Sequence, residues 1–281
     1  MRGSAVNELI SVVVSTYERP DALGAVLRSL GRQTDSNFEI VVADDGSGPQ
    51  TRDVIGNWSP KIGVPLKHVW QQDCGFRLAE IRNRAIVASA GDYVIFLDGD
   101  CVAPLHFVTV HRRLAEPGFF VGGNRVLLSQ RLTQEILAEN LEPECWRLGA
   151  WLMKRVRGDI NRLVPLVSMP LGSMRKRLAN EWEGVRGGNF AFFRADLDRV
   201  DGFETLFAGW GLEDSDIVIR MIRSGVKRKD GRFATGVFHL WHKESDRAGL
   251  SANQARLDEV MRSDRVRALR GLSTLGVPAH V

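Results

Sequence analysis

The first hundred residues of the chain alternate short apolar runs with segments of helical periodicity. This alternation is typical of βαβ units, in which helices connect parallel strands and cover the sheet. The apolar runs are rich in β-branched residues, so we interpret them as buried strands. The predicted strands cover residues 9–15, 38–43, 66–71 and 93–97, and the predicted helices begin at Pro20 and cover about 51–58 and 78–90.

The fourth apolar run ends in two acidic residues that flank a glycine, Asp98-Gly99-Asp100. Ionised carboxylates are costly to desolvate unless a positive charge pairs with them. Two carboxylates at the carboxyl end of a buried strand suit a hard divalent cation, Mg²⁺ or Mn²⁺. Asp and Gly also favour a simple turn after a core strand. These residues alone therefore leave both a metal site and a turn open.

Two other predicted strands also end in polar residues. Thr16-Tyr17-Glu18-Arg19 follows the first strand, and Asp44-Asp45-Gly46-Ser47 follows the second. In open parallel sheets, ligands bind beyond the carboxyl ends of the strands. The convergence of these two loops with Asp98-Gly99-Asp100 predicts a binding site at this edge.

The common phosphate-binding motifs are absent from the sequence. Neither a G-x-G-x-x-G after the first strand nor a G-x-x-x-x-G-K-[ST] occurs, which argues against a dinucleotide-binding dehydrogenase or a P-loop enzyme. A nucleotide would instead be held by Asp44 or Asp45, which can accept from a base N–H. Arg77 and Arg82 are candidates to pair with phosphate oxygens, whereas we assign Arg84 to a solvated helix face.

Length and composition bound the class of protein. A chain of 281 residues with 44% hydrophobic and 26% charged residues can bury the core of one large α/β domain, with or without an added lobe. It has no run of about eighteen apolar residues that would predict a transmembrane helix, and polar residues 1–8 show no secretory signal. Three widely spaced cysteines argue against a disulfide framework or a cysteine-based zinc site and fit the reducing cytosol.

Basic residues are concentrated in residues 151–182. Seven lysines and arginines stand there against two acids, a net charge of +5 in a chain of +4, so the remaining residues together carry −1. Trp, Leu and Met residues lie among them, a composition suited to an anionic membrane surface. The alternative is a flexible lid or insertion whose apolar side packs on the domain. Nucleic acid fits poorly, because the segment carries no recognisable binding module.

Two glycine-containing segments mark the second half of the chain. Residues 187–193 predict a strand that returns to the core, with glycines that permit a close approach. Residues 209–216 predict a helix start, because acids crowd the first turn, where the helix dipole favours them. Gly209 and Gly211 bracket Trp210, a pattern that predicts a shaped surface for a flat ligand.

The last predicted strand covers residues 233–240 and is followed by a helix over residues 251–270. His239 and His242 lie near the end of that strand, where they could complete a metal site with Asp100. A lone histidine is more often a buried hydrogen-bonding residue.

In this order, these pieces resemble the family 2 inverting glycosyltransferases of the GT-A fold. The matching motifs are the first strand with Thr16-Tyr17-Glu18-Arg19-Pro20, the Asp44-Asp45 loop, the Arg82-Asn83 pair and Asp98-Gly99-Asp100. Residues 73–83 resemble the catalytic domains of bacterial chondroitin polymerases. Residues 186–242 are similar to the carboxyl-terminal part of the galactosyltransferase group, whose signature is Trp-Gly-x-Glu-Asp. The resemblance implies a Rossmann-like, mostly parallel sheet flanked by helices.

The resemblance also implies roles for individual residues. Asp100 would be the direct metal ligand, with His242 as the later ligand and His239 as its nearby alternative. Asp214 would be the general base, and Glu213 would hold acceptor hydroxyls. The implied nucleotide-sugar site comprises Thr16, Tyr17, Arg19, Asp44, Asp45, Arg77, Arg82, Asn83, Asp98 and Gly99, and the implied acceptor site comprises Gly188, Trp210, Gly211 and Glu213.

The implied function is transfer of a sugar from a UDP-sugar to a hydroxyl of a glycan or glycolipid, with Mn²⁺ or Mg²⁺ as cofactor and a β-linkage as product. The setting would be cell-surface polysaccharide, lipopolysaccharide or capsule synthesis, in the cytoplasm or at the inner face of the membrane. The expected division is a donor half (1–125), a basic insertion (126–185), an acceptor half (186–245) and a helical extension (246–281).

Two alternatives are considered, one a different enzyme and one from a non-enzymatic class. A sugar-phosphate nucleotidyltransferase should carry a glycine-rich loop after the first strand, which residues 16–20 lack. A non-catalytic sugar-nucleotide or polysaccharide-binding protein is opposed by the presence of both Asp100 and Asp214.

Overall fold

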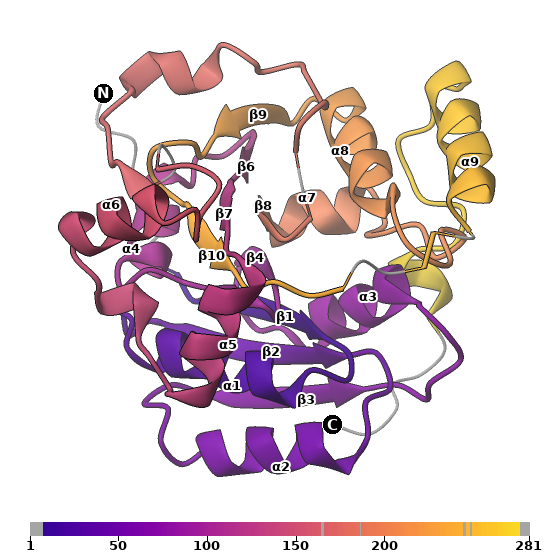
Figure 1. The fold of residues 1–281 in the computed structure, drawn as a ribbon. Helices are drawn as coiled ribbons and strands as arrows, with labels where there is room; N and C mark the ends of the chain where they lie inside the picture. The colour runs from indigo at the N-terminus through magenta and orange to yellow at the C-terminus, as the bar shows by residue number, and fades with distance from the viewer. Residues whose placement is uncertain (1–7, 164–165, 186, 244–245, 248, 276–281) are drawn as a thin grey trace.

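The computed structural model describes residues 8–163, 166–185, 187–243, 246–247 and 249–275. Its centre is a seven-stranded sheet of order β3-β2-β1-β4-β8-β6-β9 (Figure 1). All four strands predicted in the first hundred residues form its parallel half: β1 (Ile10–Thr16), β2 (Phe38–Asp44), β3 (Leu66–Trp70) and β4 (Tyr93–Asp98). The predicted α/β class with a mostly parallel central sheet is confirmed.

The other half of the sheet comes from later in the chain. β8 (Asn189–Phe193) runs antiparallel to both β4 and β6 (Phe119–Gly122), and β9 (Lys227–Asp230) is parallel to β6. A second, three-stranded sheet joins β5 (Cys101–Val102), β10 (Val237–His239) and β7 (Arg125–Leu127). Since β4 continues almost directly into β5, the second sheet begins where Asp98-Gly99-Asp100 ends the first.

Helices cover both faces of the central sheet, because alternate residues of its strands point to opposite sides. Within β1, Val12 and Val14 join one apolar cluster and Val13 joins the other. The first cluster is covered by α1 (Pro20–Gly31), α2 (Pro49–Trp58), α4 (Phe107–Leu114), α5 (Gln130–Ala138) and α6 (Leu148–Val156). The second is covered by α3 (Leu78–Ala88), α7 (Arg194–Arg199) and α8 (Glu213–Arg223).

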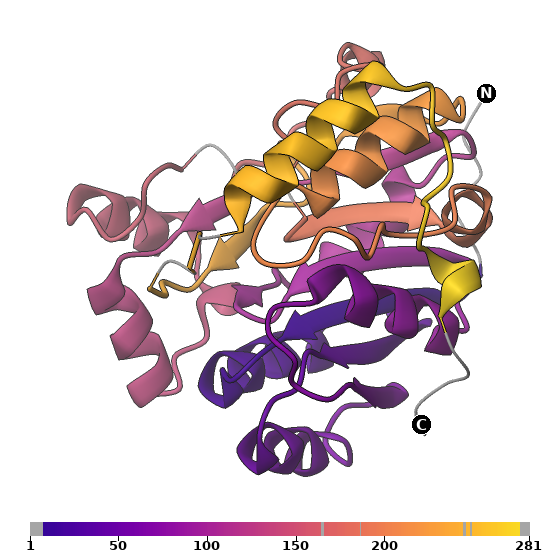
Figure 2. The same ribbon diagram turned by 90° about the vertical axis from the view of Figure 1, so that its right-hand side faces the viewer.

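The carboxyl-terminal helix α9 (Leu250–Arg262) lies along α8 (Figure 2), where Leu257 and Val260 pack with Ile219. The prediction of a helix over residues 251–270 is wrong at its end. Ser263 is extended, and Glu204 accepts the backbone N–H groups of Leu269 and Arg270. These bonds hold the chain after α9 in a non-helical path.

The predicted strand over residues 233–240 is also too long, since β10 covers only Val237–His239. Phe233 has a positive φ of 59°, which a strand does not accommodate, and Thr235 N–H closes a turn onto Gly231 O. The charged strand β9, whose sequence is Lys-Arg-Lys-Asp, has no apolar pattern and was not predicted.

The expected donor half and acceptor half are parts of one sheet. Strands from the donor half and the acceptor half lie side by side in one sheet, as β4 beside β8 and β6 beside β9 show. The boundary after residue 125 falls inside β7. Between β7 and β8, the described residues form α5, α6 and the short 3₁₀ helices Pro143–Cys145 and Gly172–Lys176, and another 3₁₀ helix, Leu272–Thr274, lies near the end of the described chain.

A buried ion pair fixes α8 against the body of the domain. Arg220 and Asp216 have fully buried side chains, and Arg220 also donates to the carbonyl oxygens of Val200 (2.8 Å) and Gly202 (2.9 Å). Without Arg220, the buried Asp216 carboxylate would keep only Arg265, 3.6 Å away, as an ionic partner among the described residues, and a buried charge that has lost its main partner is strongly destabilising.

We therefore expect Arg220→Ala to lower the free energy of unfolding by about 3–5 kcal/mol. The matched control is Arg199→Ala, because Arg199 pairs with Asp196 on the neighbouring α7 but has a side chain that is 55% exposed; that change should cost less than about 1 kcal/mol. Urea denaturation followed by circular dichroism gives both values, and equal losses in the two variants would contradict this assignment.

Candidate functional site

The polar ends of β1, β2 and β4 meet at one edge of the sheet. The strand register places Thr16 beside Asp44 and Ser15 beside Asp98. Gly99 is buried there, and its N–H donates to Ser15 O at 2.7 Å. The loops that the sequence predicted to converge therefore do so.

Arg82 lies at the centre of this edge, with a side chain that is 1% exposed. Its guanidinium donates to Asp98 Oδ1 at 3.2 Å, to Glu213 Oε1 at 3.3 Å and to Gly187 O at 3.3 Å. Arg82 was predicted to pair with phosphate, but these contacts direct its guanidinium to protein groups. It joins the Asp98 strand end to the first turn of α8.

Glu213 and Asp214 stand side by side at the start of α8. Burial raises the pKa of Glu213 to about 8, and the neighbouring Asp214 carboxylate acts in the same direction, while Arg82 opposes them. Glu213 Oε2 is buried without a hydrogen-bond partner in the part of the chain that the structure describes. Asp214 Oδ2 accepts the N–H of Gly187 at 2.5 Å, which fixes the orientation of that carboxylate.

Two glycines allow the backbone before β8 to lie against these acids. A Cβ at Gly187 would stand 2.9 Å from Asp214 Oδ2, and a Cβ at Gly188 would overlap Asp98 Oδ2. Any side chain at either position would therefore displace a carboxylate. The close approach predicted for residues 187–193 is an approach to Asp98 and Asp214.

Asp100 faces both predicted histidines. Its Oδ2 lies 3.3 Å from His242 Nε2, and its Oδ1 lies 3.6 Å from His239 Nε2. Burial lowers the pKa of His239, which favours the neutral imidazole that a metal ligand must be. A carboxylate with an imidazole beside each of its oxygens suits a divalent cation.

Cys101 adds a sulfur to this cluster that the sequence did not predict. Ligand atoms of Asp100, Cys101 and His239 all lie within 4.8 Å of one another. Burial raises the pKa of the Cys101 thiol, which lies 3.6 Å from Asp100 Oδ1 as a donor. The neutral thiol thus acts as a hydrogen-bonding neighbour of the Asp100 carboxylate.

The two acids after β2 already accept hydrogen bonds within the chain. Asp45 accepts Gln71 Nε2 (2.5 Å) and the Arg77 N–H (2.8 Å), while Asp44 accepts the Ser47 N–H and contacts His68. Burial raises the pKa of Asp45. A carboxylate oxygen has two acceptor sites, so a base N–H would be an additional donor to this pair.

The remaining predicted donor residues differ in their surroundings. Thr16 Oγ1 is buried without a hydrogen-bond partner in the described ranges, and Tyr17 is 47% exposed with its hydroxyl on Asp73. Arg19 pairs instead with Asp21 at the start of α1.

Two predicted donor residues are engaged elsewhere. Arg77 donates to Glu80 and to Gln72 O, and Arg84, assigned to a solvated face, also pairs with Glu80. Asn83 is fully buried and uses both ends of its amide on the backbone of Phe203. Asn83 on α3 thereby holds the loop after α7.

The structure places beside Asp98 an arginine that the sequence analysis did not single out. Arg125 in β7 places NH1 3.8 Å from Asp98 Oδ2, and its side chain is partly exposed. It belongs to a segment without a recognisable motif. Only the pairing of β7 with β10 brings it beside the His239 strand.

The predicted flat-ligand surface is partly covered. The guanidinium of Arg247 lies 5.0 Å from the centre of the Trp210 ring, and Trp210 is half-buried. Gly209 and Gly211 have positive φ angles, so both shape the loop that leads into α8. Trp210 and Gly211 therefore lie directly before the Glu213–Asp214 pair.

Four of the seven basic residues in 151–182 serve the fold. Arg175 is buried on backbone carbonyls, Lys176 pairs with Glu116, Lys154 pairs with Glu135, and Arg162 donates to Arg125 O. Arg155, Arg157 and Arg177 are exposed. No helix in the described part of the chain is long and apolar enough to cross a membrane.

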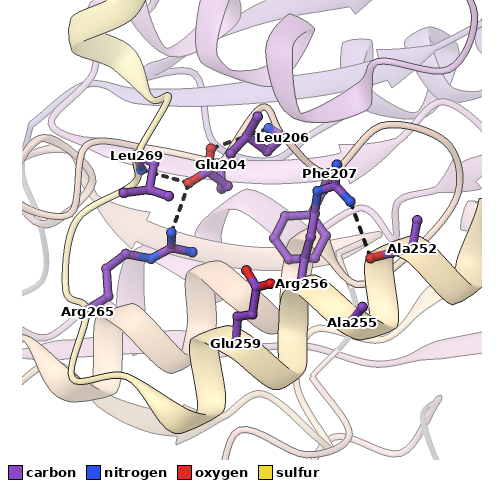
Figure 3. Close-up of a pocket in the computed structure, with 9 residues that line it drawn as sticks. All are labelled: Glu204, Leu206, Phe207, Ala252, Ala255, Arg256, Glu259, Arg265 and Leu269. Atoms are coloured by element: carbon purple, nitrogen blue, oxygen red, sulfur yellow. Dashed lines mark hydrogen bonds and ion pairs between the residues drawn. The ribbon is translucent and has the colours of Figure 1, made fainter.

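A cavity of about 470 Å³ lies against α9, and none of the predicted site residues lines it (Figure 3). Glu204 on its wall accepts the N–H groups of Leu269 and Arg270 and lies 3.6 Å from Arg265. These contacts anchor the segment after α9, so we assign the cavity no catalytic role.

Comparison with known proteins places this geometry in a family. A model of glycosyl transferase family 2 matches residues 11–200, more than half of the chain. The chain belongs to glycosyl transferase family 2. A model described as the N-terminal domain of galactosyltransferase matches residues 170–243, which include Trp210, Glu213 and Asp214. Both resemblances seen in the sequence are confirmed.

The matches to curated relatives cover a larger share of this chain than of the relatives' own length. Validoxylamine A glucosyltransferase of Streptomyces hygroscopicus subsp. jinggangensis is 29% identical over 90% of this chain and 60% of that protein. The chondroitin synthases of Pasteurella multocida and Escherichia coli are 27% and 28% identical over 77% of this chain, and 23% and 32% of those proteins. The chain thus spans 60% or less of the length of these relatives.

Solved structures confirm the GT-A fold. Mannosyltransferase PcManGT from Pyrobaculum calidifontis, in complex with GDP-Man and Mn²⁺, superposes with a TM-score of 0.62 at 17% identity, over 93% of this chain and 66% of that one. Residues 1–349 of S. aureus TarS, in complex with UDP, give 0.61 at 15% identity, over 94% and 67%.

The raised pKa of Glu213 predicts a pH-dependent loss of stability. The unfolded chain ionises this group near its ordinary pKa of about 4.3, whereas the folded chain holds the proton to about pH 8. The unfolded state then loses its proton first as the pH rises. The free energy of unfolding of the wild type should therefore fall, relative to that of Glu213→Gln, as the pH rises from about 4 to 8.

Urea denaturation at pH 5 and pH 8 without divalent cations measures this difference. Glu139→Gln is the control, because Glu139 is exposed and should give no pH-dependent difference from the wild type. If Glu213→Gln differed from the wild type equally at both pH values, Glu213 would not hold its proton in the folded state.

Proposed function

We propose that the chain is a metal-dependent, inverting glycosyltransferase. It moves a sugar from a UDP-sugar to a hydroxyl of a glycan or glycolipid acceptor and forms a β-linkage. The observation that carries this proposal is the arrangement around Arg82, which connects Asp98, beside the Asp100–histidine cluster, with Glu213, beside Asp214. A donor site and a base for the acceptor thereby share one edge.

Asp214 is the proposed general base. It takes the proton of an acceptor hydroxyl as that oxygen attacks the anomeric carbon from the face opposite the leaving group. A single displacement of this kind inverts the anomeric centre. The N–H of Gly187 holds the Asp214 carboxylate in place, and Glu213, whose Oε2 has no hydrogen-bond partner among the described residues, is the proposed contact of an acceptor hydroxyl.

The proposed cation ligands are Asp100, His239 and His242. When bound, Mn²⁺ or Mg²⁺ stabilises the negative charge of the leaving diphosphate. Arg125 is a partly exposed cation beside Asp98 and takes over the phosphate-pairing role first assigned to Arg77 and Arg82. Asp44 and Asp45, with Thr16 and Tyr17, are the proposed contacts of the base and ribose.

The names of the relatives support a role in glycan synthesis, since they include chondroitin synthases and a glucosyltransferase. We propose that the acceptor is an intermediate of a cell-surface polysaccharide, lipopolysaccharide or capsule, carried on a lipid. The enzyme would then act in the cytoplasm at the inner face of the membrane, with residues 151–182 near the anionic surface.

Donor binding should depend on both the metal and Asp100. We expect UDP with Mn²⁺ to raise the melting temperature of the wild type, with about 2.7 kcal/mol of stabilisation at a hundred times Kd, and Asp100→Ala to lose this effect. Asp92→Ala is the matched control, because Asp92 is exposed at the opposite end of β4. A panel of sugar nucleotides in the same assay identifies the donor.

An absence of stabilisation by every nucleotide in the presence of metal would contradict the proposed donor site. Stabilisation by a UDP-sugar without any transfer would instead favour a sugar-nucleotide-binding protein.

Loss of the base should slow chemistry and spare donor binding. We expect Asp214→Asn to lower kcat by roughly a hundredfold to ten-thousandfold, with the KM for the donor little changed. The control is Asp198→Asn, an exposed acid on α7. Transfer of labelled sugar to oligosaccharide acceptors measures both, and full activity in Asp214→Asn would rule out its role as base.

A further inference from the structure

Helix α6 buries one large side chain and exposes four. Trp151 is buried in the apolar cluster beneath the helix, whereas the four exposed side chains retain 52–75% of their surface: Leu148, Leu152, Met153 and Val156. Leu148, Leu152 and Val156 follow one another at four-residue spacing and so form one stripe along the helix. The helix therefore presents an apolar face outward.

Positive charge borders this stripe. Residues 145–158 contain four basic residues and no acid. Lys154 is engaged with Glu135, but the side chains of Arg147, Arg155 and Arg157 are exposed and make no hydrogen bond or ion pair within the described ranges. Arg155 follows Leu148 by seven residues, which places it on the side of the helix that carries the stripe.

We propose that α6 is an interfacial helix, whose apolar face inserts into an anionic lipid surface while its arginines contact the headgroups. An apolar stripe bordered by arginines is the pattern of helices that lie in the plane of a membrane interface. Long arginine side chains reach outward to headgroups while their stems stay beside apolar neighbours.

A second protein fits this face less well than a lipid surface does. A stable protein interface buries roughly 800 Å² on each partner, whereas nine residues of helix extend only about 13 Å. Because residues 145–158 contain no acid, the charge of this face is positive throughout. An extended anionic surface such as a bilayer complements it better than a small patch on a protein does.

The position of α6 gives this contact a consequence for the active site. The helix lies at the margin of the molecule (Figure 1), and Trp151 stacks on Phe238 with ring centres 4.4 Å apart. Phe238 directly precedes His239 in β10. A bilayer held by α6 would therefore have a fixed orientation relative to the Asp100 cluster, which deepens the proposed action on a lipid-linked acceptor.

Sedimentation with vesicles tests the proposal without any donor or acceptor. The full chain should bind vesicles of equal parts phosphatidylcholine and phosphatidylglycerol, and should bind pure phosphatidylcholine vesicles much more weakly. The double variant Leu152→Glu/Val156→Glu should lose at least tenfold in affinity, and each of Arg155→Glu and Arg157→Glu roughly fivefold or more. Val87→Glu on α3, also 50% exposed, is the matched control.

Because the substituted side chains are exposed, each variant should fold. Thermal unfolding checks that it does. Absence of wild-type binding to the anionic vesicles, or equal binding by the double variant, would overturn the proposal. Dimerisation through α6, detected as a wild-type dimer that the double variant abolishes, would overturn it in favour of a second copy. Transfer to a soluble acceptor should be equal in the wild type and the double variant, so a failure of the transferase assignment is seen separately.

Discussion

The site depends on the buried guanidinium of Arg82. A positive charge with 1% of its side chain exposed is stable only if ionic and polar partners replace its water. Asp98, Glu213, Ser15 and the Gly187 carbonyl supply these partners, and the rings of Phe190 and Phe203 lie within 5.7 Å of the guanidinium carbon. These groups come from β1, β4, the segment before β8, β8 itself, the loop after α7 and α8. One charge therefore brings together segments that are more than a hundred residues apart in the chain.

Two acids beside this charge have raised pKa values. Arg82 and burial act in opposite directions on Asp98 and on Glu213, and burial prevails, so both pKa values are raised. Asp214 is less buried than Glu213 and accepts the Gly187 N–H, which orients its carboxylate. A buried Glu213 that holds its proton, beside a less buried Asp214, suits the proposed pair of an acceptor-holding group and a base.

The sequence was sufficient where apolar pattern and chain order determine structure. The four parallel strands follow from β-rich runs, and their shared carboxyl edge follows from the rules of parallel sheets, so the meeting of Asp44, Asp98 and Asp100 was predictable. The partners of individual side chains were not predictable from the sequence. Arg82 and Arg77 looked equally suited to phosphate, but only the fold shows that one is buried between two acids and the other pairs with Glu80. Strand β9, with its charged sequence, and Arg125, without a motif, gave no local signal.

Residues 151–182 show the same limit, because the sequence does not tell which of their side chains have partners. The net charge of this segment suggested one uniform surface. The fold uses Arg175, Lys176, Lys154 and Arg162 internally and leaves the arginines of α6 exposed. Arg155 and Arg157 lie on or directly after the helix that also exposes an apolar stripe, and this helix is joined to β10 by the Trp151–Phe238 stack. Because His239 belongs to the same short strand, the surface that would meet a lipid and the cluster that would bind a cation share one rigid support.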